Sequence, residues 1–108
     1  MKNYKYLNIS NYSTDDATLF ANLQNDYSGL FTMMPDINNK TITIPEGATY
    51  KLMLLFGGDQ RFIGRYDTML TLEMTLGSEN IIKYIPFMGL IGDENVVKFY
   101  KRKQILIS

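Results

Sequence analysis

Residues 69–76 alternate between two kinds of side chain, and this alternation constrains the fold more than any other feature of the sequence. Every even position from 70 to 76 is leucine or methionine, whereas three of the four odd positions are threonine or glutamate. Successive side chains of a β-strand point to opposite faces, so a period of two predicts one buried and one outward face. A helix would spread the same apolar residues around its circumference. We therefore predict a half-buried strand.

Two runs that precede this segment are also predicted to be extended. Ile42 and Ile44 alternate with threonine, and every second residue from 50 to 56 is aromatic or apolar. The other face of 50–56 is partly apolar as well, which is typical of a central strand or of a covered outer face. Pro45-Glu46-Gly47 favours a turn between the runs, because proline fixes φ and glycine permits φ > 0.

Turn-forming residues divide the rest of the second half into further short strands. Turns are predicted over residues 57–60, 77–80 and 89–95, the first of them as a hairpin connection. The accompanying strands are expected over residues 61–66, 81–85, 96–100 and 105–107, with the last two forming one piece or two. Pro86 marks the end of its strand or a sheet edge, since proline cannot donate a hydrogen bond to a ladder.

The first 40 residues carry a mixed signal. A short strand is expected over residues 4–9. Ser13-Thr14-Asp15-Asp16 resembles a helix start, because a hydroxyl group can cap the first amides and acidic residues suit the positive end of the helix dipole. The apolar residues of Ala17–Leu23 follow at roughly helical spacing, which favours a short helix ending near Asp26. A strand over Ala17–Leu23 is the competing interpretation, and residues 27–39 are interpreted as a connection with an apolar interior.

These elements predict a single β-rich domain over residues 1–108. Six to eight short strands with glycine-rich turns and one short N-terminal helix are typical of an all-β or β-rich α+β fold, an antiparallel β-sandwich or a small barrel. An α+β roll, with the helix packed across one sheet face, is the alternative. The chain has no cysteine, so its stability must come from packing.

The composition argues against enzymatic chemistry. The chain contains neither histidine nor cysteine, which removes the commonest general base, the usual nucleophile pairs and the main zinc ligands. No phosphate-binding glycine motif is present. The remaining candidates are carboxylates expected on the solvated surface, namely Asp59, Asp67, Glu73, Asp93 and Glu94. We therefore expect no catalytic residue, no cofactor and no metal site.

Eleven basic residues balance eleven acidic residues, so no net charge attracts the chain to nucleic acid or to an anionic membrane. The longest apolar stretch, Leu52–Phe56, is too short to span a bilayer, and no secretion signal is recognised at the N-terminus. Lys101-Arg102-Lys103 follows two aromatic residues and is the candidate nucleic-acid contact. The competing interpretation is a strand edge whose lysines discourage pairing.

Apolar and aromatic residues near the predicted turns are the candidates for protein binding. Met33, Met34, Phe87 and Met88 are expected in loops, where they either plug an end of the sandwich or contact a partner. Tyr66 and Tyr84 lie near turns or on less apolar faces, and tyrosine combines a rigid ring with a polar tip that suits recognition. The expected partners are therefore proteins.

The segment Ile42–Leu52, with the sequence ITIPEGATYKL, resembles the strand, turn and strand of small β-sandwich modules from bacteriophage virions, such as capsid decoration and tail or fibre accessory proteins. The resemblance implies an enzymatically inert homo-oligomer that contacts the protein subunits of a larger assembly, located in the virion or the host cytoplasm. It transfers no functional residue. The alternative is a small inhibitor or adaptor that blocks a host enzyme by surface contact.

Overall fold

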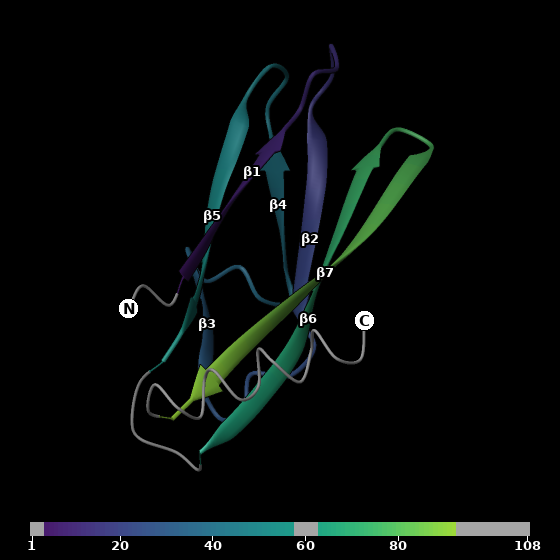
Figure 1. The fold of residues 1–108 in the computed structure, drawn as a ribbon. Coiled ribbons are helices and arrows are strands. Elements are labelled where there is room, and N and C mark those ends of the chain that lie inside the picture. Colours follow the sequence, from purple (N-terminus) through teal and green to yellow (C-terminus); the bar gives the residue numbers. More distant parts are fainter. Residues whose placement is uncertain (1–3, 58–62, 93–108) are drawn as a thin grey trace, which may run out of the picture.

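A computed structural model describes residues 4–57 and 63–92, which contain seven β-strands and no helix (Figure 1). The strands are β1 (Tyr4–Ser10), β2 (Ala17–Leu23), β3 (Phe31–Met34), β4 (Lys40–Ile44), β5 (Thr49–Phe56), β6 (Gly64–Leu76) and β7 (Glu79–Ile91). They form a three-stranded sheet, in the order β1-β5-β3, and a four-stranded sheet, in the order β4-β2-β6-β7. All paired strands are antiparallel, as predicted.

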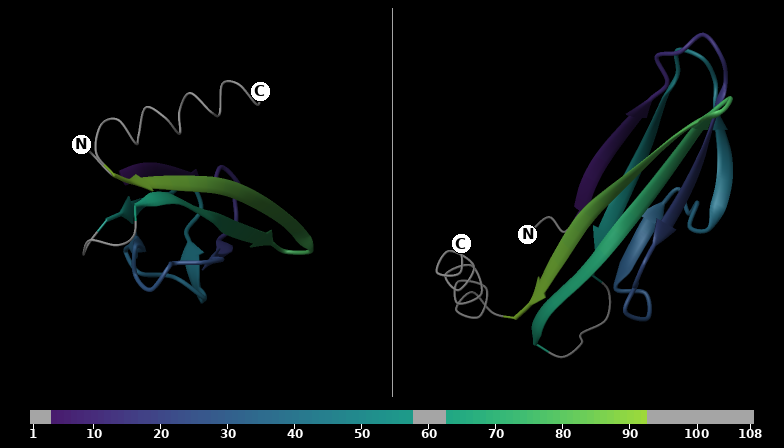
Figure 2. Two further views of the ribbon diagram at one scale, coloured as in Figure 1. Left: turned by 60° about the horizontal axis from the view of Figure 1, so that its bottom comes forward. Right: turned by 90° about the vertical axis from the view of Figure 1, so that its right-hand side faces the viewer.

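The hydrophobic core lies between the two sheets, in the arrangement of a β-sandwich that does not close into a barrel (Figure 2). Leu52 and Leu54 of β5 pack in one cluster with Leu19 of β2 and Leu70 of β6, and none of these side chains is more than 1% exposed. Burial alternates along β2, β5 and the middle of β6, so the period-two pattern of the sequence is the pattern of the core.

The predicted short helix is wrong, and Ala17–Leu23 forms β2. Its residues alternate between buried and more exposed positions, and β2 pairs with both β4 and β6 at the centre of its sheet. A segment of this length has little helical stability of its own, so two ladders of hydrogen bonds outweigh its local preference. The expected cap residues lie in the connection between β1 and β2, where the Asp16 carboxylate accepts from the backbone amide of Glu46, in the connection between β4 and β5, at 3.1 Å.

The connection after Phe56 is not the expected hairpin. β5 belongs to the three-stranded sheet and β6 to the four-stranded sheet, so the chain crosses between the two layers there. Pro45-Glu46-Gly47 lies in another connection between the two sheets, the one from β4 to β5. Gly47 has a φ of 71°, and the Ala48 amide donates to the Pro45 carbonyl at 3.0 Å, which confirms the predicted turn.

β6 and β7 form one long hairpin of two thirteen-residue strands. Their register runs from Gly64 opposite Ile91 to Leu76 opposite Glu79, so the predicted turn at 77–80 is confirmed in a tighter form. The loop expected around residues 86–88 is wrong, because the residues from Pro86 to Ile91 continue β7. The turn expected over 89–95 is wrong for residues 89–91, and residues 93–95 lie outside the described residues. Likewise Met33 and Met34 lie in β3 and not in a loop. Pro86 does sit on an edge strand, as its missing amide predicts.

The side chain of Asn11 joins two of the crossings between the sheets. Its amide nitrogen donates to the backbone carbonyls of Asp15 at 2.8 Å and Ile44 at 2.9 Å, and its oxygen accepts from the amide and hydroxyl of Ser13. Its backbone amide donates to the carbonyl of Ala48 at 2.9 Å. Asn11 is 4% exposed, so these bonds replace water for the groups they reach.

Aromatic rings from both sheets meet at the other end of the core. Phe31 lies 4.8 Å from Phe56 and 5.4 Å from Phe87 between ring centroids, and Phe56 lies 6.1 Å from Tyr66. Gly89 of β7 is buried against this cluster, and a Cβ atom there would overlap the ring of Phe56. Glycine at position 89 is therefore required by the close approach of Phe56.

Replacing Asn11 by alanine is expected to lower the free energy of unfolding by about 1–3 kcal/mol, because the buried carbonyl of Ile44 loses its donor. Urea denaturation followed by circular dichroism measures the change. The matched control is Asn8→Ala, since Asn8 is exposed on β1 and its replacement should stay within about 0.5 kcal/mol of the unmodified chain. Equal effects of the two substitutions would contradict the role of Asn11.

Replacing Gly89 by alanine is expected to cost about 1–3 kcal/mol of stability, because the new methyl group displaces the Phe56 ring. The same substitution should cost less in a Phe56→Leu background, where the obstructing ring is gone. A double-mutant cycle in urea measures this coupling. An identical cost in both backgrounds would show that Phe56 is not the obstacle.

Candidate protein-binding site

β7 is the longest open edge of the described sandwich. Within residues 4–57 and 63–92, it pairs with β6 along one side, and no strand pairs with its other side. The end of the β6–β7 hairpin that carries the turn between the two strands projects away from the remaining strands (Figures 1 and 2). The outer side of β7 therefore presents backbone donors and acceptors that another extended segment can use.

Large apolar side chains are exposed on this same edge. Ile81 is 61% exposed, Ile82 46% and Tyr84 65%. Successive residues of a strand point to opposite faces of the sheet. Ile81 therefore lies on the face that is turned toward the three-stranded sheet, while Ile82 and Tyr84 lie on the outer face. Pro86, Met88 and Leu90 continue the outer face, so β7 is apolar on both sides of the sheet.

An apolar groove of about 390 Å³ runs between β1 and the β6–β7 hairpin. β1 and β7 are the edge strands of the two sheets, so two open edges flank one hollow. The apolar walls of the groove are Leu7, Ile9, Leu19, Leu72, Met74, Ile81 and Ile85. Lys83, with the polar residues Asn8 and Ser10, completes its lining.

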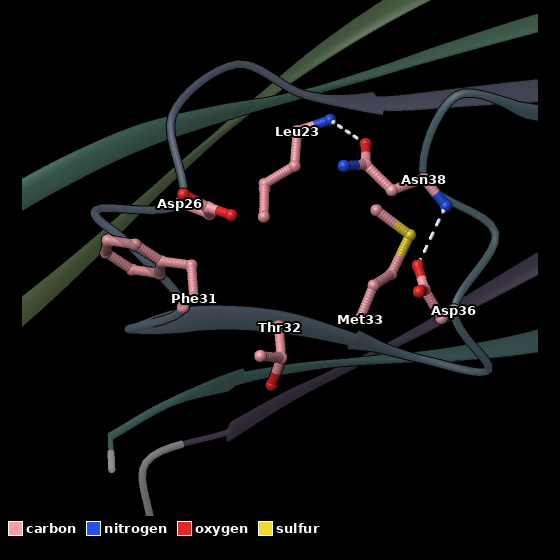
Figure 3. Close-up of a pocket in the computed structure, with 8 residues that line it drawn as sticks. Leu23, Asp26, Phe31, Thr32, Met33, Asp36 and Asn38 are labelled. Atoms are coloured by element: carbon pink, nitrogen blue, oxygen red, sulfur yellow. Dashed lines mark hydrogen bonds between the residues drawn. The ribbon is translucent and has the colours of Figure 1, made fainter. Parts of the chain in front are cut away.

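A second hollow, of about 290 Å³, lies beside β3 and is more polar (Figure 3). Its acidic groups are held by local turns. The carboxylate of Asp26 accepts from the Ser28 amide at 3.0 Å, and that of Asp36 accepts from the Asn38 amide at 3.2 Å. The Asn38 side chain accepts from the Leu23 amide at 2.8 Å. These side-chain oxygens accept hydrogen bonds that stabilise the loops around β3. Their positions are therefore explained without a bound ligand.

The described residues contain no group of three or more acidic, histidine or cysteine side chains that could hold a metal ion. Asp67 forms an exposed ion pair with Arg65, with 3.0 Å between Nε and Oδ2, and Glu73 lies half-buried on the outer face of β6. Asp59, Asp93, Glu94 and the basic segment Lys101-Arg102-Lys103 lie outside the described residues, as do the strands expected over 96–100 and 105–107.

The six candidate protein-binding residues have different surroundings. Met33 is buried, and Tyr66 and Phe87 pack within the aromatic cluster. Met34 is 55% exposed on β3. Tyr84 and Met88 share the outer face of β7, four residues apart.

The sequence reasoning missed Ile81, Ile82 and the groove-lining residues of β1. The signal that was available is the run 81–85, which is apolar on both faces yet stands directly before a proline. Two apolar faces are typical of a central strand, whereas proline indicates an edge. An edge strand with two apolar faces leaves apolar surface uncovered.

The carboxylate of Asp36 is expected to stabilise its turn by accepting the hydrogen bond from the Asn38 amide, and its negative charge is not expected to contribute to stability. Replacing it by asparagine preserves an acceptor oxygen and should change the free energy of unfolding by less than about 0.5 kcal/mol, whereas alanine should cost about 0.5–1.5 kcal/mol. Urea denaturation of the two variants measures the difference. Equal losses would show that the negative charge itself is used.

Comparison of the sequence with protein families and with curated proteins finds no match. Among solved structures, the chain is similar to the crystal structure of the E. coli chaperone DraB, with a TM-score of 0.53 and 8% sequence identity. The likeness covers 80% of this chain and 46% of that chain, so the chain spans less than half the length of DraB. At this identity the likeness shows the fold alone. No described segment is a helix with the length and hydrophobicity needed to cross a membrane.

Proposed function

We propose that this chain is a non-enzymatic protein-binding module, and that its docking surface is the open edge of β7 together with the adjoining groove. The observation that carries the proposal is the exposure of Ile81, Ile82 and Tyr84 on an edge with no strand partner among the described residues. Long apolar edges are sites where another chain adds to a sheet.

The chemistry of this surface suits an extended polypeptide. A strand laid along β7 would satisfy its outward backbone groups, and every second side chain of that strand would point toward the groove. The groove walls are mainly aliphatic, so apolar side chains on the partner gain most from this contact. A small polar ligand would leave the aliphatic walls without matching surface.

The proposed setting is a larger assembly, in which the module acts as a virion accessory or decoration protein and associates with copies of itself. The resemblance of Ile42–Leu52 to virion modules and the balanced charge support this setting, because a neutral chain does not repel its own copies. The likeness in fold to a chaperone, a kind of protein that acts on other proteins, is in keeping with protein binding.

Affinity capture from the native source is expected to recover a specific protein that an Ile82→Lys variant no longer retains. The added charge on the outer face of β7 would have to lose water when a partner covers that face. Mass spectrometry identifies what is recovered. Subunits of an assembly would support the virion role, whereas a cellular enzyme inhibited by the chain would favour the inhibitor or adaptor.

Tyr12→Lys is the matched control, because Tyr12 is 93% exposed in the connection between β1 and β2, outside both the β7 edge and the groove. Circular dichroism confirms that both variants are folded. Retention of the same protein by Ile82→Lys, together with its loss from Tyr12→Lys, would place the docking surface elsewhere and contradict the proposal.

A further inference from the structure

The only charged residues of β7 are Glu79 and Lys83. Both have the same parity as Ile81, so all three point to the groove side of the sheet. Glu79 precedes Ile81 by two positions and Lys83 follows it by two. This spacing is symmetric about Ile81, with opposite charges at its two ends.

We infer that a second copy of this chain pairs antiparallel with β7 through a twofold axis at Ile81. This inference rests on the proposed function and names the partner of the same edge. In the pairing, Glu79 of each copy lies opposite Lys83 of the other, and the two Ile81 side chains face one another. Opposite charges in directly opposed positions stabilise an antiparallel pair, and a twofold axis supplies the contact twice.

Neighbouring registers lack this match. An axis at Lys83 would place the two lysines opposite each other, which is destabilising. An axis at Ile82 would oppose Lys83 to Ile81 and Glu79 to Ile85, leaving every charge beside an apolar side chain. Ile81 is therefore the centre at which the charges of β7 complement each other.

The position of Pro86 shows which residues of β7 have outward backbone groups. Proline lacks an amide, so in a strand fully paired with β6 it takes a position whose backbone groups face away from β6. The even-numbered residues share that orientation, so Asn80 and Ile82 present outward amides and carbonyls. An axis at Ile81 opposes Asn80 to Ile82 of the second copy, where the two residues can exchange hydrogen bonds.

The same geometry brings the side chains at the axis close together. Ile81 faces Ile81 in a position between hydrogen-bonded pairs, where opposed Cα atoms are about 4.5 Å apart. Because β7 begins at Glu79, the paired segment in this register runs only from Glu79 to Lys83. Because the paired segment is short, the dimer is weak and depends on concentration.

Charge reversal tests the pairing in the full chain. Glu79→Lys alone opposes lysine to lysine, and Lys83→Glu alone opposes glutamate to glutamate, so each should raise the dimer dissociation constant about tenfold. A mixture of the two variants restores both ion pairs and should dimerise as the unmodified chain does. Sedimentation equilibrium measures association as an apparent mass that rises from 12.5 kDa toward twice that value.

Glu46→Lys and Lys51→Glu are the matched controls, because they change the net charge equally at exposed positions outside β7. Both should leave the dimer unchanged. Either of two results would overturn the inference: a monomer at all concentrations, as expected if residues beyond 92 of the same chain cover the edge, or a mixture that dimerises no better than its separate components.

Cysteine cross-linking tests the register itself, since the natural chain has no cysteine. Ile81→Cys places two thiols on the axis, within the distance range of a disulfide, and a mild oxidant should convert this variant to a covalent dimer. Ile82→Cys is the matched control, because its symmetry mate lies diagonally, about 7–8 Å away. Equal cross-linking of the two variants would refute the axis at Ile81.

These results are separable from those that test the proposed function. A purified chain that stays monomeric while Ile82→Lys loses a captured protein would refute self-pairing and leave the docking surface supported. Self-pairing together with unchanged capture by Ile82→Lys would support the pairing and place the captured protein at another surface.

Discussion

The buried hydrogen bonds of Asn11 hold the two layers of the sandwich in place. The chain crosses between sheets after β1 and again after β4, and both crossings meet at this one side chain. A buried carbonyl without a donor is costly, so the crossings can lie close together only while the asparagine amide serves both.

The strands that the sequence predicted best are those whose burial is one-sided. In β5 and the central part of β6, the alternation of side chains coincides with the alternation of burial, so local pattern and tertiary position agree. The helix predicted over β2 is wrong because two patterns coexist there: Ala17, Phe20 and Ala21 fit a helical spacing, whereas Ala17, Leu19, Ala21 and Leu23 fit a period of two. Only its pairing with β4 and β6, which joins residues far apart in the chain, decides between the two patterns. The same limit applies to the segment after Phe56, since a glycine-rich turn carries no information about which sheet the next strand enters.

The sequence did not predict the proposed docking surface, for a related reason. Exposure of Ile81 depends on what the other sheet leaves uncovered, and that is a property of strand order. Ile82 lies on the outer face of its own sheet, where it is 46% exposed. The sequence instead predicts apolar residues at turns as the candidates. Of these, Met33 is buried in β3, and Tyr66 and Phe87 pack in the aromatic cluster within the long β6–β7 hairpin. Tyr84 was identified because tyrosine is informative by residue type, independent of the fold.

β7 combines features that promote and restrict strand addition. Its apolar faces and outward backbone groups favour pairing, whereas Lys83 and Pro86 are among the residues that natural edge strands use against indiscriminate aggregation. A lysine on an open edge resists a partner that lacks a carboxylate at the opposing position, and a proline ends the ladder after a few residues. A strand that adds here as proposed must therefore supply a negative charge opposite Lys83 and forgo a hydrogen bond from Pro86. In the proposed function, such an edge would select its partner by register as well as by hydrophobicity, which would distinguish it from a surface that is merely prone to aggregate.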